Sequence, residues 1–574
     1  MNAKASPRCP VLNRGMLVAA AALGVGAGLA QAQVVVVPAA PQVGSSNPVT
    51  AVPPVARPHR KPCIVPLFHS LQFADFTPKA FSYAPPADCP GPWAKVVFAA
   101  DFTVTAGRQF DRTAAFYLGH ANIYYGTTAE PRAGLSPSWH VERDVTDLTA
   151  LLRSAQTGEA NLGNFVGVSD GVTYDGIIYA SARLEFYPAS GRDAPTTADL
   201  VVPVNGADGD AGALDTTAST ITQTLNLPRN VERAYLDVIA QSQSNDEFWY
   251  FCVPSDEAAN LESCGNTPFR ETEITIDGQP AGVAPVYPWI YTGGIDPYLW
   301  EPLPGVQTLD FRPYRVDLTP FAGLLADGNP HVLAVSVFNA NRYFLATATL
   351  LVFTDHGRRQ VSGGLLSNTL AAAPTPVIKE NIKTDAAATT FTGSIAVAAN
   401  RQFAITGYVD TSHGRIVTTL EQSIGYLNTQ QFDVSPSQDV QNVQQLTTVE
   451  SHVTTRGAGL ESSREQQLSY PLKINYTFVF NPDGTVTQTT VIDQRALEFS
   501  GSFPGGATSF ASERRSTDTL NYDASGNFLG PSGSQASAAY VAHGPDGCFS
   551  RTLAAQAQKL TAVKDGANCP GHAH

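Results

Sequence analysis

The residues of this chain best suited to chemistry gather between positions 233 and 305. Carboxylates accept hydrogen bonds from sugar hydroxyls or transfer protons, and indole rings stack on the apolar faces of sugar rings. The acidic side chains of this segment include Asp246, Glu247, Glu271, Glu273 and Asp296, and its tryptophans are Trp249, Trp289 and Trp300. This combination is typical of a site that handles sugars. The alternative, a sandwich core with a few surface acids, stays open on these residues alone.

Other kinds of catalytic machinery are not indicated by the sequence. The HExxH, Walker A and strand-bound GxGxxG patterns are all missing, which removes zinc-protease and nucleotide chemistry. Residues 167–171 match GxSxG, but no helix is indicated after them, so we expect a turn between strands. Asp208, Asp210 and Asp215 miss the EF-hand spacing and fit an acidic connector better than a calcium loop. We therefore expect no metal and no cofactor, and carboxylate acid–base chemistry remains.

The elements that must position these residues are predicted to be β-strands. Charged residues make up only 15% of the 574-residue chain, and its 47 glycines and 41 prolines favour short strands and turns over helices. Apolar and polar residues alternate along 473–479 and 485–491, which is the period of a strand. The sequence therefore predicts an all-β fold.

Six segments are expected along the chain. They are a signal peptide (1–32), a Pro/Ala-rich leader (33–61), a first jelly-roll domain (62–195), a second jelly-roll domain (196–355), a linker (356–383) and a C-terminal antiparallel β domain (384–574). A short helical pattern recurs at 143–152 and 319–328, which supports two similar sandwiches in tandem. The NPDG run at 481–484 predicts a hairpin tip in the last domain.

Several features indicate export. Basic residues precede an apolar run at 16–29 and an Ala-Gln-Ala cleavage pattern, as in a secretory signal. The formal net charge of −14 argues against a nucleic-acid or anionic-membrane partner. We expect a secreted or periplasmic protein with disulfides. The simplest of the fifteen pairings joins sequence neighbours, as Cys63–Cys89, Cys252–Cys264 and Cys548–Cys569.

Five blocks of the chain resemble the plant and fungal peptide-N-glycanase A family. They occupy 106–131 (AGRQFDRTAAFYLGHANIYYGTTAEP), 138–152 (SWHVERDVTDLTALL), 233–252 (RAYLDVIAQSQSNDEFWYFC), 265–282 (GNTPFRETEITIDGQPAG) and 289–321 (WIYTGGIDPYLWEPLPGVQTLDFRPYRVDLTPF). FDRTAAFY, RDVTDLTALL and RAYL are also distantly similar to the flavobacterial PNGase F, in which two jelly-roll sandwiches bracket the site. The resemblance covers about residues 95–350, and the C-terminal part matches less clearly.

This resemblance implies hydrolysis of the amide that joins an asparagine side chain to the innermost N-acetylglucosamine of an N-glycan. The protein product carries aspartate, and the sugar leaves as a glycosylamine. The family's catalytic aspartate falls on Asp111, which would position and activate water, and Arg112 beside it would hold the core sugar. The alternative for Asp111 is a strand-end acid paired with Arg108 or Arg112.

The second catalytic carboxylate is harder to place. In the flavobacterial relative a glutamate just before the Phe-Arg pair supports catalysis, but the corresponding place here is near Asn266, which we assign to substrate binding together with Arg270. Glu271 is the first choice for protonating the leaving nitrogen, because alternation puts it on one face with Glu273 and their repulsion would raise one pKa. Glu247 is the second choice for this proton donor, and its neighbour Asp246 is assigned to substrate binding. The alternative is that Glu271 and Glu273 are both strand acids that face solvent.

The remaining expectations concern sugar binding. Trp249, Trp289 and Trp300 are candidate sugar platforms, although each could equally pack in a core, and Asp296 could bind a sugar hydroxyl or cap a turn. Gly293 and Gly294 are expected to adopt a backbone conformation with positive φ, which glycine takes readily. The resulting hypothesis is a monomeric peptide-N-glycanase acting on N-glycoproteins or glycopeptides, acid-active and tolerant of core fucose. The alternatives are a non-catalytic glycan-binding sandwich protein and a glycoside hydrolase.

Overall fold

The computed structural model describes residues 40–566, except 131, 170, 192, 458 and 546. The expected signal peptide, the first part of the leader and Cys569 lie outside these residues. Almost all regular structure in the described part is β, so the all-β prediction is confirmed. No helix among the described residues is long and apolar enough to cross a membrane.

The first sandwich consists of two four-stranded antiparallel sheets. One has the order β1 (Cys63–Phe73), β10 (Ile178–Pro188), β3 (Trp93–Val104), β6 (Ser138–Asp144), and the other β2 (Lys79–Tyr83), β7 (Gln156–Asn161), β4 (Thr113–Leu118), β5 (Ala121–Thr127). Their facing sides bury a cluster of aromatic rings in which Phe102 stacks on Trp139. The short hairpin of β8 (Gly167–Ser169) and β9 (Val172–Tyr174) confirms that the GxSxG match is a turn between strands.

The second sandwich repeats this plan. One sheet has the order β11 (Leu200–Val204), β19 (Asn341–Thr354), β14 (Val231–Ser242), β17 (Tyr314–Asp317), with β12 (Gly212–Thr216) also paired to β19. The other has the order β13 (Ile221–Leu225), β18 (His331–Phe338), β15 (Glu271–Ile276), β16 (Gln279–Pro285). Equivalent short helical turns occur in both sandwiches, as expected: η1 (Thr146–Leu148) with α1 (Thr149–Leu152), and η5 (Thr319–Phe321) with α2 (Ala322–Leu325).

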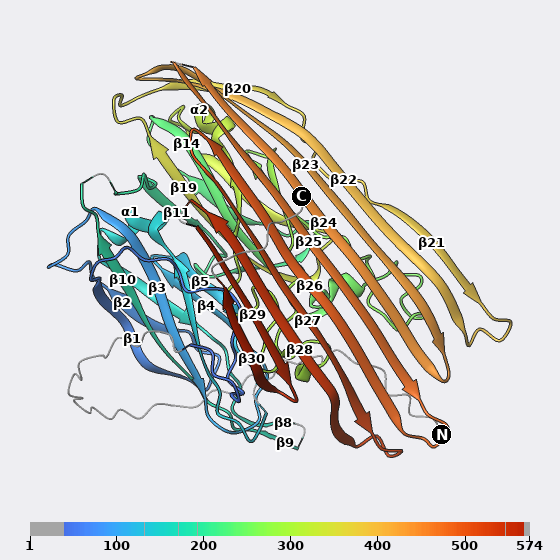
Figure 1. Ribbon diagram of the computed structural model, residues 1–574. Helices are drawn as coiled ribbons and strands as arrows, with labels where there is room; N and C mark the ends of the chain where they lie inside the picture. The colour runs from blue at the N-terminus through green and yellow to red at the C-terminus, as the bar shows by residue number, and fades with distance from the viewer. Residues whose placement is uncertain are drawn as a thin grey trace.

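The C-terminal part forms one eleven-stranded antiparallel sheet, which we call the large sheet. Figure 1 shows its long strands, yellow to red, lying side by side across the sandwiches. The strands are β20 (Ser362–Asn368), β21 (Val377–Thr384), β22 (Phe391–Thr411), β23 (Gly414–Ser435), β24 (Gln438–Gly457), β25 (Leu460–Phe480), β26 (Val486–Phe503), β27 (Ala507–Tyr522), β28 (Phe528–Gly544), β29 (Gly547–Gln556) and β30 (Lys559–Gly566).

Two of the predictions concern the large sheet. The NPDG run at 481–484 does connect β25 to β26 as a hairpin. The segment 356–383 is not simply a linker, because β20 and β21 lie largely within it and both pair with β22. Its Gly, Pro and Ala content reflects the turns around these two short edge strands rather than a free connection.

The large sheet shares its core with the second sandwich. Ile395 and Val397 of β22 belong to the same buried cluster as Val335 and Val337 of β18. Two disulfides, Cys63–Cys89 and Cys252–Cys264, confirm those expected pairings. The third expected pair includes Cys569 and stays a prediction.

Candidate active site

A pocket of about 330 Å³ opens between the two sandwiches. Its polar lining includes residues from the β3–β4 connection, from the end of β7 and from the segment after β14. These residues include Asp111, Arg112, Thr113, Asn161, Asp210, Gln243, Glu247 and Tyr291. The pocket therefore brings Asp111 and Glu247 together, although they are 136 positions apart in the sequence.

Asp111 is half-buried where the chain enters β4. Its Oδ2 accepts a hydrogen bond of 2.8 Å from the backbone N–H of Gly293. Burial raises the pKa of Asp111, while that hydrogen bond and the charges of Arg112 and Arg132 oppose the rise. The pKa of Asp111 still lies above its ordinary value, and these contacts limit the rise; the ionised form is the one that can take a proton from water.

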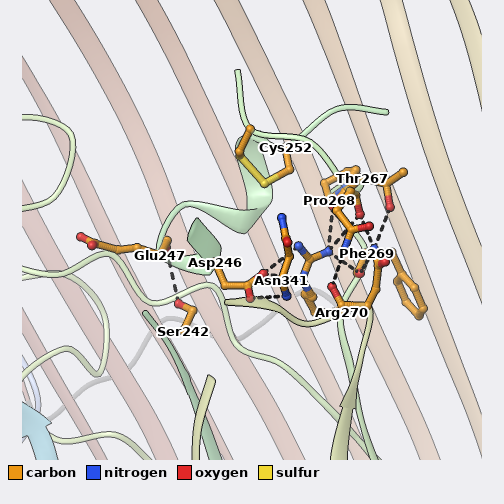
Figure 2. Close-up of polar contacts among 12 residues, drawn as sticks. Ser242, Asp246, Glu247, Cys252, Thr267, Pro268, Phe269, Arg270 and Asn341 are labelled. Atoms are coloured by element: carbon orange, nitrogen blue, oxygen red, sulfur yellow. Dashed lines mark hydrogen bonds and ion pairs between the residues drawn. A yellow bond between two sulfur atoms is a disulfide. The ribbon is translucent and has the colours of Figure 1, made fainter. Parts of the chain in front are cut away.

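Glu247 lies directly after the turn η2 (Ser244–Asp246), whose last residue is buried. Figure 2 shows that the Glu247 carboxylate points away from the neighbouring Asp246. Burial and the negative charges of Asp111 and Glu130 raise the pKa of Glu247 to about 8. Glu247 is therefore protonated at acidic and neutral pH and can donate a proton.

Glu130 is a third carboxylate of this site, which the sequence analysis did not single out. Burial and the charge of Asp111 raise the pKa of Glu130 to about 7, although Arg132 donates a 3.0 Å hydrogen bond to its Oε1. The signal that could have found it is the β4–β5 hairpin, in which Thr113 pairs with Thr127. This register returns the chain to Asp111, so residues just past β5 must lie beside it.

Arg112 supplies an available donor at the pocket. One guanidinium nitrogen donates to Gln109 Oε1 at 2.6 Å, whereas the buried Nε has no hydrogen-bond partner among the described residues. A buried donor without a partner is costly, so a polar group of a ligand would satisfy it. Arg112 lines the pocket, and the sugar-holding role expected for it stays a prediction.

Gly293 is required for space rather than for positive φ. A Cβ there would lie 2.1 Å from Glu130 Oε2 and 2.8 Å from Asp111 Oδ1. The positive φ in this turn belongs to Ile295, at 65°. The expectation of positive φ at Gly293 and Gly294 was therefore wrong, since neither is among the residues with that conformation.

Asp246 and Arg270 form a buried ion pair beside the pocket (Figure 2). Asp246 Oδ1 accepts two hydrogen bonds from the guanidinium, at 2.8 and 2.9 Å, and its Oδ2 accepts one from the N–H of Asn341. Both side chains are fully buried. The substrate contacts expected of this pair are therefore corrected to a structural role, which fixes the turn that presents Glu247.

Asn266 also has a structural role in place of the expected substrate contact. Its amide nitrogen donates to the backbone oxygen of Asn339 at 2.9 Å, and its φ is 76°. It does not line the pocket. Asparagine is one of the side chains that best tolerate this left-handed backbone, which explains its presence at this turn.

Glu271 lies elsewhere, between the second sandwich and the large sheet. Its carboxylate is 3.3 Å from the guanidinium of Arg401 on β22, and burial raises its pKa to about 8. Alternation correctly predicted one shared face for Glu271 and Glu273, and both interact with Arg401. That face meets the large sheet rather than the pocket, which leaves Glu247 as the candidate proton donor that lines the pocket.

The three candidate tryptophan platforms are core residues. Trp249 and Trp300 are 0% and 2% exposed within the core that joins the second sandwich to the large sheet. Trp289 is 4% exposed and packs on Phe311. Their rings are covered by protein and cannot stack on a sugar in this conformation. Asp296 is also buried, and its Oδ1 caps η4 (Pro297–Trp300) by accepting from the N–H of Tyr298, so the expected sugar contact is corrected to the turn-capping role.

Taken together, the pocket is lined by the carboxyls Asp111, Asp210 and Glu247 and by Arg112, with Glu130 beside Asp111, and burial raises the pKa of Asp111, Glu130 and Glu247. Such a set can activate water, protonate a leaving group and bind polar substrate, without a nucleophilic serine or cysteine. The described residues include no group of three His, Cys, Asp or Glu side chains arranged to hold a metal ion. The fold and site thus define a two-sandwich protein whose pocket carries the carboxyl groups that hydrolysis without a metal or a nucleophilic side chain requires.

Comparison with known proteins specifies the class. The family model described as peptide N-acetyl-β-D-glucosaminyl asparaginase amidase A matches residues 54–369, and the C-terminal domain of the same family matches residues 394–472. The chain therefore belongs to this amidase family, and the resemblance seen in the sequence is confirmed. It is 28% identical over 467 residues to peptide-N4-(N-acetyl-β-glucosaminyl)asparagine amidase A of Prunus dulcis, covering 78% of this chain and 80% of the relative.

Two solved structures are also similar. PNGase F, a glycosylasparaginase from Flavobacterium meningosepticum, aligns with a TM-score of 0.35 and 14% identity over 51% of this chain and 96% of its own. PNGF-II aligns with a TM-score of 0.34 and 14% identity over 52% of this chain and 66% of its own.

Proposed function

We propose that the chain hydrolyses the amide between an asparagine side chain and the innermost N-acetylglucosamine of N-glycoproteins or N-glycopeptides. The observation that carries this proposal is that Asp111 and Glu247 line one pocket between the sandwiches, with Glu130 beside Asp111. Family membership supports the choice of bond. A monomer suffices, because both sandwiches that contribute to the pocket belong to one chain.

In the proposed reaction Asp111 takes a proton from water, whose oxygen attacks the amide carbon. The carbon–nitrogen bond then breaks, and the nitrogen leaves as a glycosylamine after receiving the proton of Glu247. The peptide retains aspartate, and a proton passing from Asp111 to Glu247 restores the site. Glu130 lies close enough to both groups to influence each charge, since its own raised pKa is due partly to Asp111 and it raises that of Glu247.

The raised pKa of Glu247 supports activity at acidic pH, down to the pH at which Asp111, whose pKa is also raised, takes up a proton itself. Glu247 must carry its proton, so activity falls as the pH rises through about 8, and Glu130 begins to ionise near pH 7. The two disulfides fit an oxidising compartment, which supports secretion or periplasmic export. Tolerance of core fucose rests on the family resemblance and is tested with paired fucosylated and unfucosylated substrates.

The test is mass spectrometry of a defined N-glycopeptide incubated with the protein in heavy-oxygen water. The expected product is a peptide in which asparagine has become aspartate with one heavy oxygen, and Asp111→Asn is expected to abolish it. Asp208→Asn, which changes a nearby acid outside the pocket lining, serves as the control variant. A free reducing sugar with N-acetylglucosamine left on asparagine would instead establish a glycoside hydrolase, and binding without conversion would establish a lectin.

A further inference from the structure

The segment 287–306 connects the active site to the large sheet. On the pocket side, the Gly293 N–H binds Asp111, and Thr292 Oγ1 donates to the backbone oxygen of Thr128 at 2.7 Å. The following turn is compact: the indole of Trp300 donates to the oxygen of Gly294 at 2.9 Å. The position of the Gly293 N–H therefore depends on what holds this turn from behind.

Buried side chains of β26 and β27 hold it from behind. Gln488 donates to the oxygen of Ile295 at 3.1 Å, and Gln494 donates to the oxygen of Pro288 at 2.8 Å while accepting from Val306 N–H at 2.9 Å. Arg514 donates to the oxygens of Leu299 and Leu303, at 2.5 and 2.8 Å. All three side chains are at most 8% exposed. The large sheet thus forms the back of the active-site segment.

Asp518 of β27 meets Asp296 of this turn directly. Asp296 Oδ1 accepts from Tyr298 N–H, and Asp518 Oδ1 accepts from the hydroxyl of Ser534. The two carboxyl groups interact with each other, and each Oδ2 is buried without a hydrogen-bond partner among the described residues. Two negative charges would repel each other in this buried place, whereas one proton shared by the pair removes the repulsion, so we expect one of the two carboxyls to be protonated.

The other groups around the pair do not replace that proton. Arg132 is the cation that acts on Asp296, but it already binds Glu130 and Glu301. Arg514, on the same strand as Asp518, binds backbone oxygens. Burial and the charge of Asp296 raise the pKa of Tyr522, so its hydroxyl is neutral at working pH.

We propose that Asp518 is a positioning residue, whose shared proton with Asp296 fixes the 291–300 turn and so keeps the Gly293 N–H on Asp111. Loss of that proton places two negative charges in a buried contact and releases the turn. This inference rests on the proposed function only in that the reaction uses Asp111. It gives the large sheet a part in catalysis, although none of its residues lines the pocket.

The pH dependence has a definite sign. Burial raises the pKa of both carboxyls, and the neighbouring Asp518 adds to the rise at Asp296, whose pKa is about 8, while the contact with Asp296 opposes the rise at Asp518; the pair therefore holds its proton at acidic pH and loses it as the pH rises. The turn is therefore fixed in acid and released toward alkaline pH. This effect adds to the deprotonation of Glu247, but it acts on the backbone and can be measured without substrate.

The experiment is hydrogen–deuterium exchange of the full chain between pH 5 and 9, corrected for the intrinsic exchange rate, with peptides spanning 291–303. The wild type is expected to lose protection there as the pH rises. Asp518→Asn keeps a neutral donor facing Asp296, so its protection should remain constant. Asp518→Ala removes the contact and should be unprotected throughout. Asp565→Asn, at an exposed carboxylate of the same sheet, should behave as the wild type.

Kinetics provide the second measurement. At pH 5 Asp518→Ala is expected to lower kcat roughly tenfold with little change in KM, as for a misplaced catalytic group, and Asp518→Asn to restore it. The proposal is overturned if Asp518→Asn shows the wild-type loss of protection, or if it is as unprotected as Asp518→Ala. If the exchange results are as expected but no variant converts glycopeptide, the positioning stands and the proposed function fails.

Discussion

Asp111, Glu130 and Glu247 carry the same functional group, and their surroundings separate their roles. Asp111 accepts a backbone N–H, which favours its charged form. Glu247 has no counterion among the groups that shift its pKa, only burial and two negative neighbours. A base and an acid can therefore coexist at one pH within one pocket, the pattern typical of paired catalytic carboxylates.

Glu247→Gln is expected to lower kcat by about 10² to 10⁴-fold, because the leaving nitrogen loses its proton donor. The remaining activity should no longer fall as the pH rises through about 8, since the group with that pKa is gone. The measurement is a pH–rate profile of glycopeptide hydrolysis. Glu271→Gln is the matched control, and its profile should keep the wild-type shape. A full loss in the control with none in Glu247→Gln would return the donor role to Glu271.

Gly293→Ala is expected to reduce activity by at least tenfold, because the added methyl would overlap Glu130 Oε2 and Asp111 Oδ1 and displace both. Gly134→Ala, where a Cβ meets nothing within 4 Å, should leave activity unchanged. Steady-state rates and circular dichroism of both variants distinguish a displaced site from a misfolded protein. Wild-type rates in Gly293→Ala would show that this close approach is not needed.

At the scale of elements, short turns rather than the strands carry the site. Glu247 follows the single turn η2, which is fixed by the buried Asp246–Arg270 pair. Asp111 precedes β4 and Glu130 follows β5, so one hairpin places both. Loops positioned by a rigid scaffold are the usual location of catalytic groups.

Arg270→Met is expected to lower the free energy of unfolding by about 3–5 kcal/mol, because Asp246 is left buried without its partner. The loss should be smaller at pH 5 than at pH 8, since protonation then relieves the unpaired charge. Denaturant unfolding at the two pH values provides the measurement. Arg456→Met removes an exposed pair instead and should cost about 0–1 kcal/mol. Equal effects of both substitutions would contradict the role given to the buried pair.

Some of these elements could be predicted from the sequence and others could not, for physical reasons. Alternation at 473–479 and the recurring helical turns predicted strands and tandem sandwiches correctly, because they depend on local periodicity. The place of Glu271 depends on a third sheet covering β15, and periodicity carries no information about that layer. The prediction that the tryptophans form sugar platforms was wrong for a related reason, since an indole suits a core and a sugar platform equally. Glu130 could be predicted only by first pairing Thr113 with Thr127, because that pairing places the residues after β5 beside Asp111.

At the scale of the whole molecule, many buried carboxyls interact across the layers. Burial raises the pKa of Glu271 and Glu247 to about 8 and of Glu130 and Asp439 to about 7. The folded chain therefore binds more protons than the unfolded chain above about pH 4.5. Stability must then fall as the pH rises through this range.

The expected result is a melting temperature highest near about pH 5 and lower at pH 8. Below that maximum, carboxylates with lowered pKa take up protons, as for Glu142, whose pKa is about 2 because His140 and Arg57 bind it. Thermal unfolding at closely spaced pH values measures the curve. Glu271→Gln should flatten its alkaline side, whereas a curve that rises from pH 5 to pH 8 would contradict the assignment of raised pKa values.

The core shared by β18 and β22 also bears on how such genes can change. Phe269 packs on Phe338 of β18 and on Tyr426 of β23, so the second sandwich and the large sheet bury apolar rings against each other. A gene that lost the strands from β20 onward would encode a second sandwich with an exposed apolar face, prone to association. We therefore expect the sandwich and the sheet to be retained or lost together.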